Sequence, residues 1–157
     1  MPKAGLQFSD KDEWYTPKYI VDYFGCFEYD PATSKKQAEY LGIPNYDTIE
    51  TDGLTKDWQT YNKIWINPPF TKKFEFLSKA VKTDSHIFFL LPIETMTTKK
   101  FHQIVKDKAF IVHIPNGRIK FFDNDGWGKS PAFGTVVIEF SPYITKRINN
   151  LFDIGKL

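Results

Sequence analysis

Apolar residues along the 157-residue chain gather in short runs, and most runs alternate with segments in which apolar residues recur at helical spacing. The runs predict strands, and the segments between them predict helices. Residues 45–58 are mixed and polar with a weak strand near 47–51, and residues 144–152 are predicted to form a polar helix or tail. The expected strands span residues 26–30, 62–66, 85–91, 109–114, 118–122 and 133–140, and the expected helices span 16–25, 34–42, 71–81 and 97–107.

Strands that alternate with helices predict an α/β fold around a mostly parallel sheet. The last three strands follow one another without a helix, which predicts antiparallel strands at one end of that sheet. The length suits one domain, residues 1–157, with a flexible arm over residues 1–12 and no separate target-recognition domain. The polar, glycine-rich stretch 123–131 is predicted to be a loop.

Composition limits the partners, the cellular location and the kinds of site to expect. A net charge of +2 neither requires nor excludes nucleic acid. The single cysteine, Cys26, rules out an intramolecular disulfide and favours a reducing, cytoplasmic location. The longest apolar stretch, residues 87–93, is too short to span a membrane, and the three histidines share no metal-ligand spacing. Neither a membrane nor a metal is therefore expected as a partner.

One short stretch, Asn67-Pro68-Pro69-Phe70, follows an apolar strand and combines residue types that suit a particular chemistry. Prolines cannot donate to a sheet ladder, so they fix a rigid turn at the carboxyl end of the strand, where open α/β sheets bind ligands. The Asn67 side-chain oxygen and the Pro68 carbonyl offer two acceptors for the two N–H bonds of a ring-conjugated amine. Phe70 offers a plane on which a base can stack. The plain alternative is a strand end followed by a turn.

Asn-Pro-Pro-aromatic is the catalytic motif of amino-methyltransferases that use S-adenosylmethionine, and the chain resembles the phage-type, Dam-like DNA N-6-adenine methyltransferases. The resemblance runs from about Asp12 to Phe140 in the blocks DEWYTP, FEYDPAT, DGLTKDW, IWINPPF, GRIKFF and FGTVVIEF. It implies a Rossmann-like, S-adenosylmethionine-dependent methyltransferase sheet that transfers a methyl group to the 6-amino group of adenine in DNA. It also implies a protein of a bacterial host or phage-infected cell, for which protection from restriction is a natural role.

The same resemblance assigns a cofactor site to three blocks. Asp30-Pro31-Ala32 is expected to run beneath the methionine part of the cofactor, with the Asp30 carboxylate facing its positive groups. Tyr15-Thr16-Pro17 is expected beside it, since Thr16 caps a helix whose free N–H groups suit the cofactor carboxylate. Asp52 is expected to accept from the adenine amino group of the cofactor, and Leu54 to pack on its ring.

Some features of the cofactor site stay open at this point. No Gly-x-Gly follows Asp30, so the cofactor loop is expected to be different or abbreviated. Asp47 and Glu50 are both candidates for the ribose hydroxyls, with a solvated acidic loop as the alternative. Asn67 is expected to contact the cofactor as well as the substrate.

Basic and aromatic residues alternate between residues 116 and 131, a pattern typical of contacts with a nucleic-acid backbone and an unstacked base. Arg118, Lys120 and Lys129 are therefore expected to face DNA, with a hairpin carrying solvated charges as the alternative. The lysines in the TKK stretch, residues 71–73, are expected to be solvated.

Two other functions stay open. The Asn-Pro-Pro-aromatic motif also serves methyltransferases of RNA adenine and of protein glutamine, and a degenerate methyltransferase fold would bind nucleic acid without catalysis. The short chain predicts relaxed or very short target specificity in a monomer, or target readout shared within a small homo-oligomer.

Overall fold

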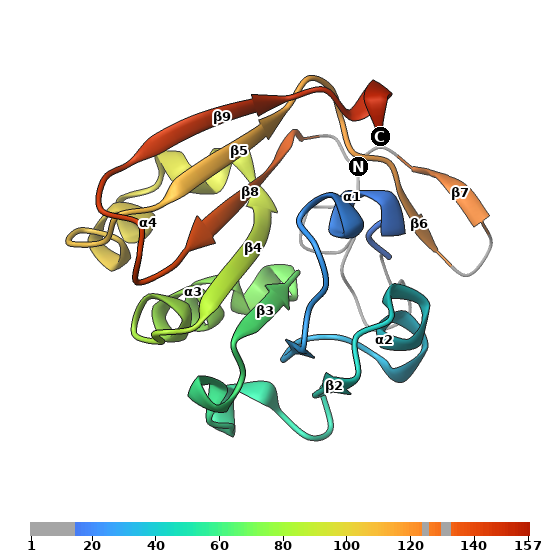
Figure 1. Ribbon diagram of the computed structural model, residues 1–157, viewed down its shortest axis with the longest axis horizontal. Helices are drawn as coiled ribbons and strands as arrows, with labels where there is room; N and C mark the ends of the chain where they lie inside the picture. Colours follow the sequence, from blue (N-terminus) through green and yellow to red (C-terminus); the bar gives the residue numbers. More distant parts are fainter. Residues whose placement is uncertain (1–14, 124–125, 130–132) are drawn as a thin grey trace.

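The computed structural model describes residues 15–123, 126–129 and 133–157, which form an α/β fold around a seven-stranded sheet (Figure 1). The expected arm, residues 1–12, lies outside the described residues. The sheet contains β1 (Tyr29–Asp30), β2 (Asn45–Tyr46), β3 (Lys63–Ile66), β4 (His86–Pro92), β5 (Ile111–Pro115), β8 (Thr135–Phe140) and β9 (Ile148–Phe152). A separate hairpin pairs β6 (Phe121–Asp123) with β7 (Gly126–Lys129), and the α-helices are α1 (Lys18–Tyr23), α2 (Lys35–Leu41), α3 (Lys73–Val81) and α4 (Lys99–Ile104).

The strand order is β2-β1-β3-β4-β8-β5-β9, and every neighbouring pair is parallel except the two pairs that β8 makes with β4 and β5. The expected mostly parallel α/β sheet is confirmed. It differs from the expectation in two respects. A single antiparallel strand, β8, lies inside the sheet rather than several at its end, and the strand expected over 118–122 belongs to the separate hairpin. Since β8 runs opposite to β4, its first residue, Thr135, pairs with the last residue of β4, Pro92.

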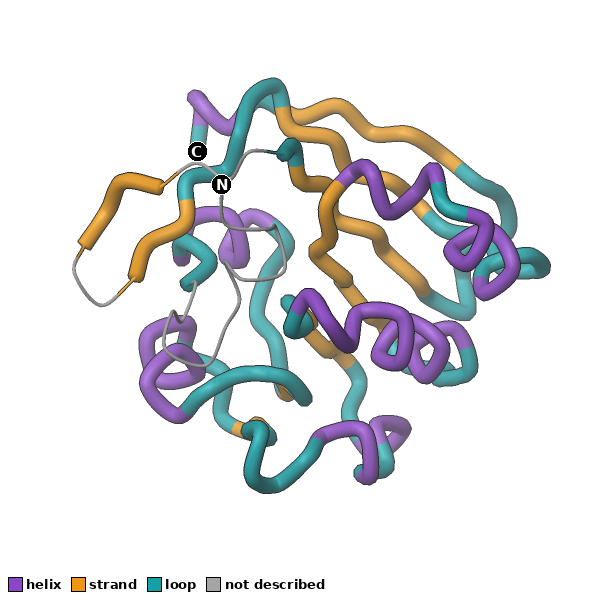
Figure 2. Tube along the Cα trace, turned by 180° about the vertical axis from the view of Figure 1, so that it is seen from behind, coloured by secondary structure: helices purple, strands orange, loops and turns teal. Residues whose placement is uncertain are grey.

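Alternate side chains of the central strands build two cores, one on each face of the sheet. Ile87, Phe89 and Leu91 of β4 pack in a cluster with residues of α3 and α4, whereas Phe88 and Leu90 pack in a cluster with residues of α1 and α2. Figure 1 shows the two helix pairs on opposite sides of the sheet, and Figure 2 shows the same layers from behind. The sheet is therefore buried on both faces at its centre, as its continuous apolar runs predict.

Local sequence signals set several element ends. The Ser34 hydroxyl accepts from the Gln37 N–H at 3.2 Å and caps α2, and Gly42 ends that helix at φ +74°, so both predicted signals are confirmed. The prediction of a late helix or tail over 144–152 was wrong, because β9 pairs there with β5. As an edge strand it exposes much of its length, which explains its polar sequence.

Two further expectations differ in detail. The weak strand expected near 47–51 is β2, two residues earlier, and a turn follows it. Part of the stretch 123–131, expected to be a loop, forms β7 and the end of β6. The strand expected over 118–122 overlaps β6, and the hairpin was the alternative considered for this segment. Only β7 escaped the strand prediction, because its sequence is polar and glycine-rich.

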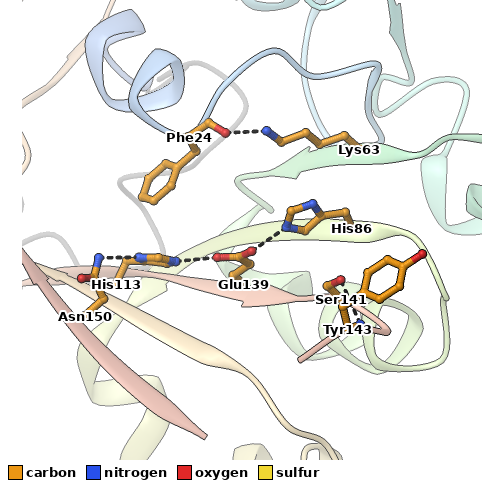
Figure 3. A network of polar contacts seen from close by, with 8 residues as sticks. All are labelled: Phe24, Lys63, His86, His113, Glu139, Ser141, Tyr143 and Asn150. Atoms are coloured by element: carbon orange, nitrogen blue, oxygen red, sulfur yellow. Dashed lines mark hydrogen bonds and ion pairs between the residues drawn. The ribbon is translucent and has the colours of Figure 1, made fainter. Parts of the chain in front are cut away.

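A partly buried polar network ties four strands together across the sheet (Figure 3). The Glu139 carboxylate on β8 is hydrogen-bonded to His86 Nε2 on β4 and, at 2.8 Å, to His113 Nε2 on β5. Asn150 on β9 contacts His113 Nδ1 at 2.9 Å. Partial burial raises the pKa of Glu139, but the two histidine hydrogen bonds lower it more and leave it at about 2. The network therefore holds an ionised carboxylate within the sheet.

We expect Glu139→Gln to lower the free energy of unfolding at pH 7 by about 1–3 kcal/mol, because it removes the charge from both hydrogen bonds. The pKa of Glu139 is lower in the folded protein, so its contribution is complete above its ordinary pKa and is lost as pH falls toward about 2. Urea unfolding of the two proteins should show a difference that shrinks in acid. Glu39→Gln, on an exposed position of α2, is the matched control. Equal losses in the two variants would contradict a special role for the network.

Candidate active site

The carboxyl ends of the parallel strands bring the sequence-predicted residues together at one edge of the sheet. Asp30 ends β1, Asp47 follows β2, and Asn67 follows β3. Backbone hydrogen bonds join the first two loops, from Asp47 N–H to the Asp30 carbonyl at 3.0 Å and from Thr33 N–H to the Asp47 carbonyl at 3.1 Å. Parallel pairing thus gathers at one edge groups far apart in the sequence.

The loop Asp52-Gly53-Leu54 lies directly on the loop Asp30-Pro31-Ala32. A Cβ atom at Gly53 would lie 2.0 Å from the Pro31 carbonyl oxygen, so only glycine fits this approach. The Trp58 indole N–H donates to the Gly53 carbonyl at 2.8 Å. Lys79 Nζ donates to the Leu54 carbonyl at 2.9 Å. The two predicted cofactor loops therefore form one closely packed unit.

Asp30 is a buried carboxyl group at the centre of this unit, with 2% of its surface exposed. Its Oδ1 accepts from the Ala32 N–H at 3.0 Å. Burial raises the pKa of Asp30 to about 7, although this hydrogen bond lowers it. A carboxyl group poised near neutrality is matched to a cationic ligand, because a nearby positive charge would favour its ionised form.

The other predicted acidic residues have different surroundings. The Tyr29 hydroxyl donates to Asp47 Oδ2, and desolvation and this hydrogen bond to the carboxylate raise the pKa of Tyr29. Glu50 is exposed in the turn after β2, where the Thr48 hydroxyl donates to it. Asp52 Oδ1 accepts from the Leu54 N–H at 3.2 Å, which holds its side chain at the loop surface. Asp47 therefore lies closer to Asp30 in structure than Glu50 does, and its position suits the ribose better.

Asn67 and Thr16 are joined by a hydrogen bond that the sequence does not reveal. Asn67 Nδ2 donates to Thr16 Oγ1 at 3.1 Å, and Thr16 is completely buried. The prediction that Thr16 caps α1 was wrong, because Pro17 holds the N-cap position and no side chain caps the helix. The Thr16 hydroxyl instead fixes the orientation of the Asn67 amide. Among the described residues, none donates a hydrogen bond to Asn67 Oδ1 or to the Pro68 carbonyl.

Phe70 begins a short 3-10 helix, Phe70–Lys72, and a lysine lies on its ring. Lys73 Nζ is 3.6 Å from the centroid of Phe70 and 5.3 Å from that of Phe74. Desolvation lowers the pKa of Lys73, and none of the described carboxylates forms an ion pair with it. The prediction that the lysines of residues 71–73 are solvated was therefore wrong for Lys73, although Lys72 is exposed. The sequence signal that could have predicted this contact is the spacing of three residues between Phe70 and Lys73 at the start of a helix.

The hairpin of β6 and β7 lies against Tyr15, three residues before α1. Tyr15 and Phe122 exchange two backbone hydrogen bonds, at 2.8 and 3.2 Å, and their rings pack edge to face. Tyr15 is buried, so its position favours packing over a wall of the cofactor site. Arg118 and Lys120 are exposed on the segment between β5 and β6, whereas the Lys129 side chain lies outside the described part of the chain.

The described residues contain no group of three or more histidine, cysteine or acidic side chains arranged to hold a metal ion. No helix within the described ranges has both the length and the apolar character needed to cross a membrane.

We expect the buried Asp30 to make stability depend on pH. Its pKa is higher in the folded protein, so its contribution is complete in acid and is lost as pH rises from the ordinary value near 4 to about 7. Asp30→Asn keeps the acceptor for Ala32 and removes the titration. In urea unfolding, the wild type should lose stability relative to Asp30→Asn over this interval, by up to about 1.4 kcal/mol per pH unit. Asp84→Asn, at an exposed position, should run parallel to the wild type. Parallel profiles for Asp30→Asn as well would contradict the shift.

Known proteins are similar to this chain in sequence. A family model described as DNA N-6-adenine-methyltransferase (Dam) matches residues 3–148. A DNA N-6-adenine-methyltransferase of Haemophilus phage HP1 is 32% identical over 134 residues, which cover 80% of this chain and 75% of that protein. One of Escherichia phage T1 is 26% identical, and the match covers 76% of this chain but only 52% of that protein.

Solved structures are similar at lower identity. A putative class I S-adenosylmethionine-dependent methyltransferase of Listeria monocytogenes has a TM-score of 0.45 at 12% identity, over 82% of this chain and 50% of that one. A predicted O-methyltransferase of Agrobacterium tumefaciens has a TM-score of 0.44 at 11% identity, over 81% of this chain and 69% of that one. The family assignment comes from the sequence matches, of which the family model covers residues 3–148 and the two relatives cover 80% and 76% of the chain. The chain belongs to the DNA N-6-adenine-methyltransferase (Dam) family.

Proposed function

We propose that the protein transfers a methyl group from S-adenosylmethionine to the 6-amino group of adenine in DNA. The observation that carries this proposal is the fixed Asn67 amide at the sheet edge where the Asp30 and Asp52 loops meet. Because Nδ2 is held by Thr16, Oδ1 is the atom left to accept from a substrate. Membership of the family supports the same reaction and the same substrate.

The Asn67–Phe70 turn supplies two acceptors for the adenine amine. Asn67 Oδ1 and the Pro68 carbonyl each accept a hydrogen bond from one N–H group of the amine. These two hydrogen bonds draw the nitrogen lone pair out of conjugation with the ring. Two features hold these acceptors before substrate arrives: the Thr16 hydrogen bond fixes the first, and the stiff proline turn fixes the second. Such preorganised dipoles contribute directly to the rate because they need no reorganisation during the reaction.

The residues of the loop unit fit the cofactor by their chemistry. When bound, S-adenosylmethionine supplies an electrophilic methyl group on a positively charged sulfur. Asp30 would face its positive groups in ionised form, Asp47 would accept from the ribose hydroxyls, and Asp52 with Leu54 would hold the adenine. Because Asp30 has a pKa of about 7 without a cation beside it, ionising it for binding releases a proton when the site is neutral or acidic.

Lys73 and Phe70 together prepare the site for an extruded base. A stacked base is worth roughly 1–3 kcal/mol, whereas a cation on an aromatic ring is worth about 0.5–2 kcal/mol. An incoming adenine can therefore displace the ammonium from Phe70 when that charge gains a better partner. The phosphate backbone that enters with the base is such a partner, so Lys73 exchanges an aromatic face for a phosphate as the base takes its place.

We expect Asn67→Ala to reduce methyl transfer to DNA by at least about 10²-fold, the usual cost of removing one preorganised partner. Binding of S-adenosylmethionine, measured by calorimetry, should persist. Asn67→Asp keeps an acceptor oxygen but loses the donor to Thr16, so it should retain more activity than Asn67→Ala. Labelled cofactor with DNA, RNA and protein substrates gives the rates. Equal loss of cofactor binding in Asn67→Ala would mean that Asn67 is structural, and transfer to RNA or protein alone would contradict the DNA assignment.

We expect Lys73→Gln to weaken DNA binding and to lower the slope of log K against log salt by about one, because one phosphate contact is lost. Fluorescence titrations at several salt concentrations measure this slope. Lys82→Gln is the matched control, since Lys82 is an exposed lysine at the other end of α3. An unchanged slope in Lys73→Gln would contradict the exchange of partners.

A further inference from the structure

A small hollow lies beneath the Asn67–Phe70 turn, where β3 and β4 end and β8 begins. One wall is the turn with Lys73, and the other is formed by the last residues of β4 and the first of β8. The lining residues on which the inference depends are Asn67, Pro68, Phe70, Lys73, Pro92 and Thr135. The antiparallel pairing of Thr135 with Pro92 places the start of β8 opposite the turn. The cavity volume is only about 10 Å³ in the free protein, so a base stacked on Phe70 would occupy this place only after the Lys73 side chain has left the ring.

Thr135 carries a buried hydroxyl in this wall. The residue is 3% exposed, and among the described residues its Oγ1 has no hydrogen-bond partner. An unpaired buried hydroxyl lowers the free energy of unfolding by about 1–3 kcal/mol. The three residues that follow Thr135 in β8, Val136, Val137 and Ile138, are apolar. Valine would fill the same volume without that cost. The hydroxyl is therefore a destabilising feature of the free protein that a ligand can relieve.

The Asn67–Phe70 turn by itself does not distinguish one exocyclic amine from another. Its two acceptors address only N–H bonds, and its aromatic plane stacks on any base. The ring nitrogens beside the adenine amine, N1 and N7, are acceptors, so reading them needs a donor. Cytosine offers N3 in the place of N1 but has no counterpart of N7, so only a donor to N7 separates the two bases. The Thr135 hydroxyl is a donor in the same hollow as Asn67.

We propose that Thr135 is a specificity-determining residue whose hydroxyl donates a hydrogen bond to a ring nitrogen of the target adenine: N7, which cytosine lacks, or N1, which excludes only bases with a ring N–H at that position. This inference rests on the proposed adenine methylation. Asn67 and Pro68 hold the amine, Phe70 holds the ring plane, and Thr135 reads the ring edge. A site that hydrogen-bonds its substrate rejects analogues without the partner atom, because its own polar group is then left unpaired.

Thr135→Val tests this inference because a hydrogen-bonding role and a packing role predict opposite results. The variant should be at least as stable as the wild type in urea unfolding, since it removes an unpaired buried hydroxyl. Its kcat/KM on adenine-containing DNA should fall about tenfold, the equivalent of one neutral hydrogen bond. Cofactor binding should not change. Thr135→Ser keeps the hydroxyl and should retain most of the activity.

Oligonucleotides with 1-deazaadenine or 7-deazaadenine at the target identify the partner atom. The wild type should lose about tenfold on the analogue that lacks the partner nitrogen, and Thr135→Val should lose nothing further on it. Two results would overturn the inference while the proposed function stands. One is full activity of Thr135→Val on adenine; the other is the same fold loss of Thr135→Val relative to the wild type on adenine and on both analogues. If the wild type methylates no adenine in DNA, the proposed function fails and the inference with it.

Discussion

The parallel pairing of β1, β3 and β4 is the constraint on which the site depends. Parallel strands all end at the same edge, so the loops that follow them must meet there. Asp30, Asn67 and the end of β4 reach this edge from separate parts of the chain. The hydrogen bond from Asn67 to Thr16 then holds the segment just before α1 at the same edge. A shift of one residue in this register would turn Ile64 and Ile66 away from their core and move Asn67 with them.

The same edge gathers polar groups that the free protein leaves unbalanced. Among the described residues, Asp30 is a buried carboxyl group that no cation contacts, Lys73 is a half-buried ammonium that no carboxylate pairs, and Thr135 carries a buried hydroxyl with no hydrogen-bond partner. Elsewhere in the sheet a partly buried charge is satisfied, as Glu139 is by two histidines. The contrast locates the functional edge, because each unbalanced group costs stability that a bound ligand of complementary chemistry restores.

Sequence reasoning recovers what depends on local pattern. Apolar runs identified the central strands, and Ser34 and Gly42 identified the ends of α2, because each signal acts within a few residues. The Asn67–Phe70 turn was also visible, since its residue types follow an apolar strand directly. The hydrogen bond between Thr16 and Asn67 could not be predicted, because the two residues are 51 positions apart in the sequence. The local sequence around Thr16 is explained equally well by a helix cap. Thr135 was hidden for the same reason, since a threonine in a strand is ordinary until its surroundings are known.

The central claim is that this edge of the sheet presents two acceptors to the exocyclic amine of adenine. The most direct test locates the transferred methyl group. Unmethylated DNA is incubated with the protein and isotope-labelled S-adenosylmethionine, digested at neutral pH, and its nucleosides are identified by mass spectrometry against standards. The account predicts labelled 6-methyladenine. A label on a ring nitrogen of adenine, or on cytosine alone, would contradict it.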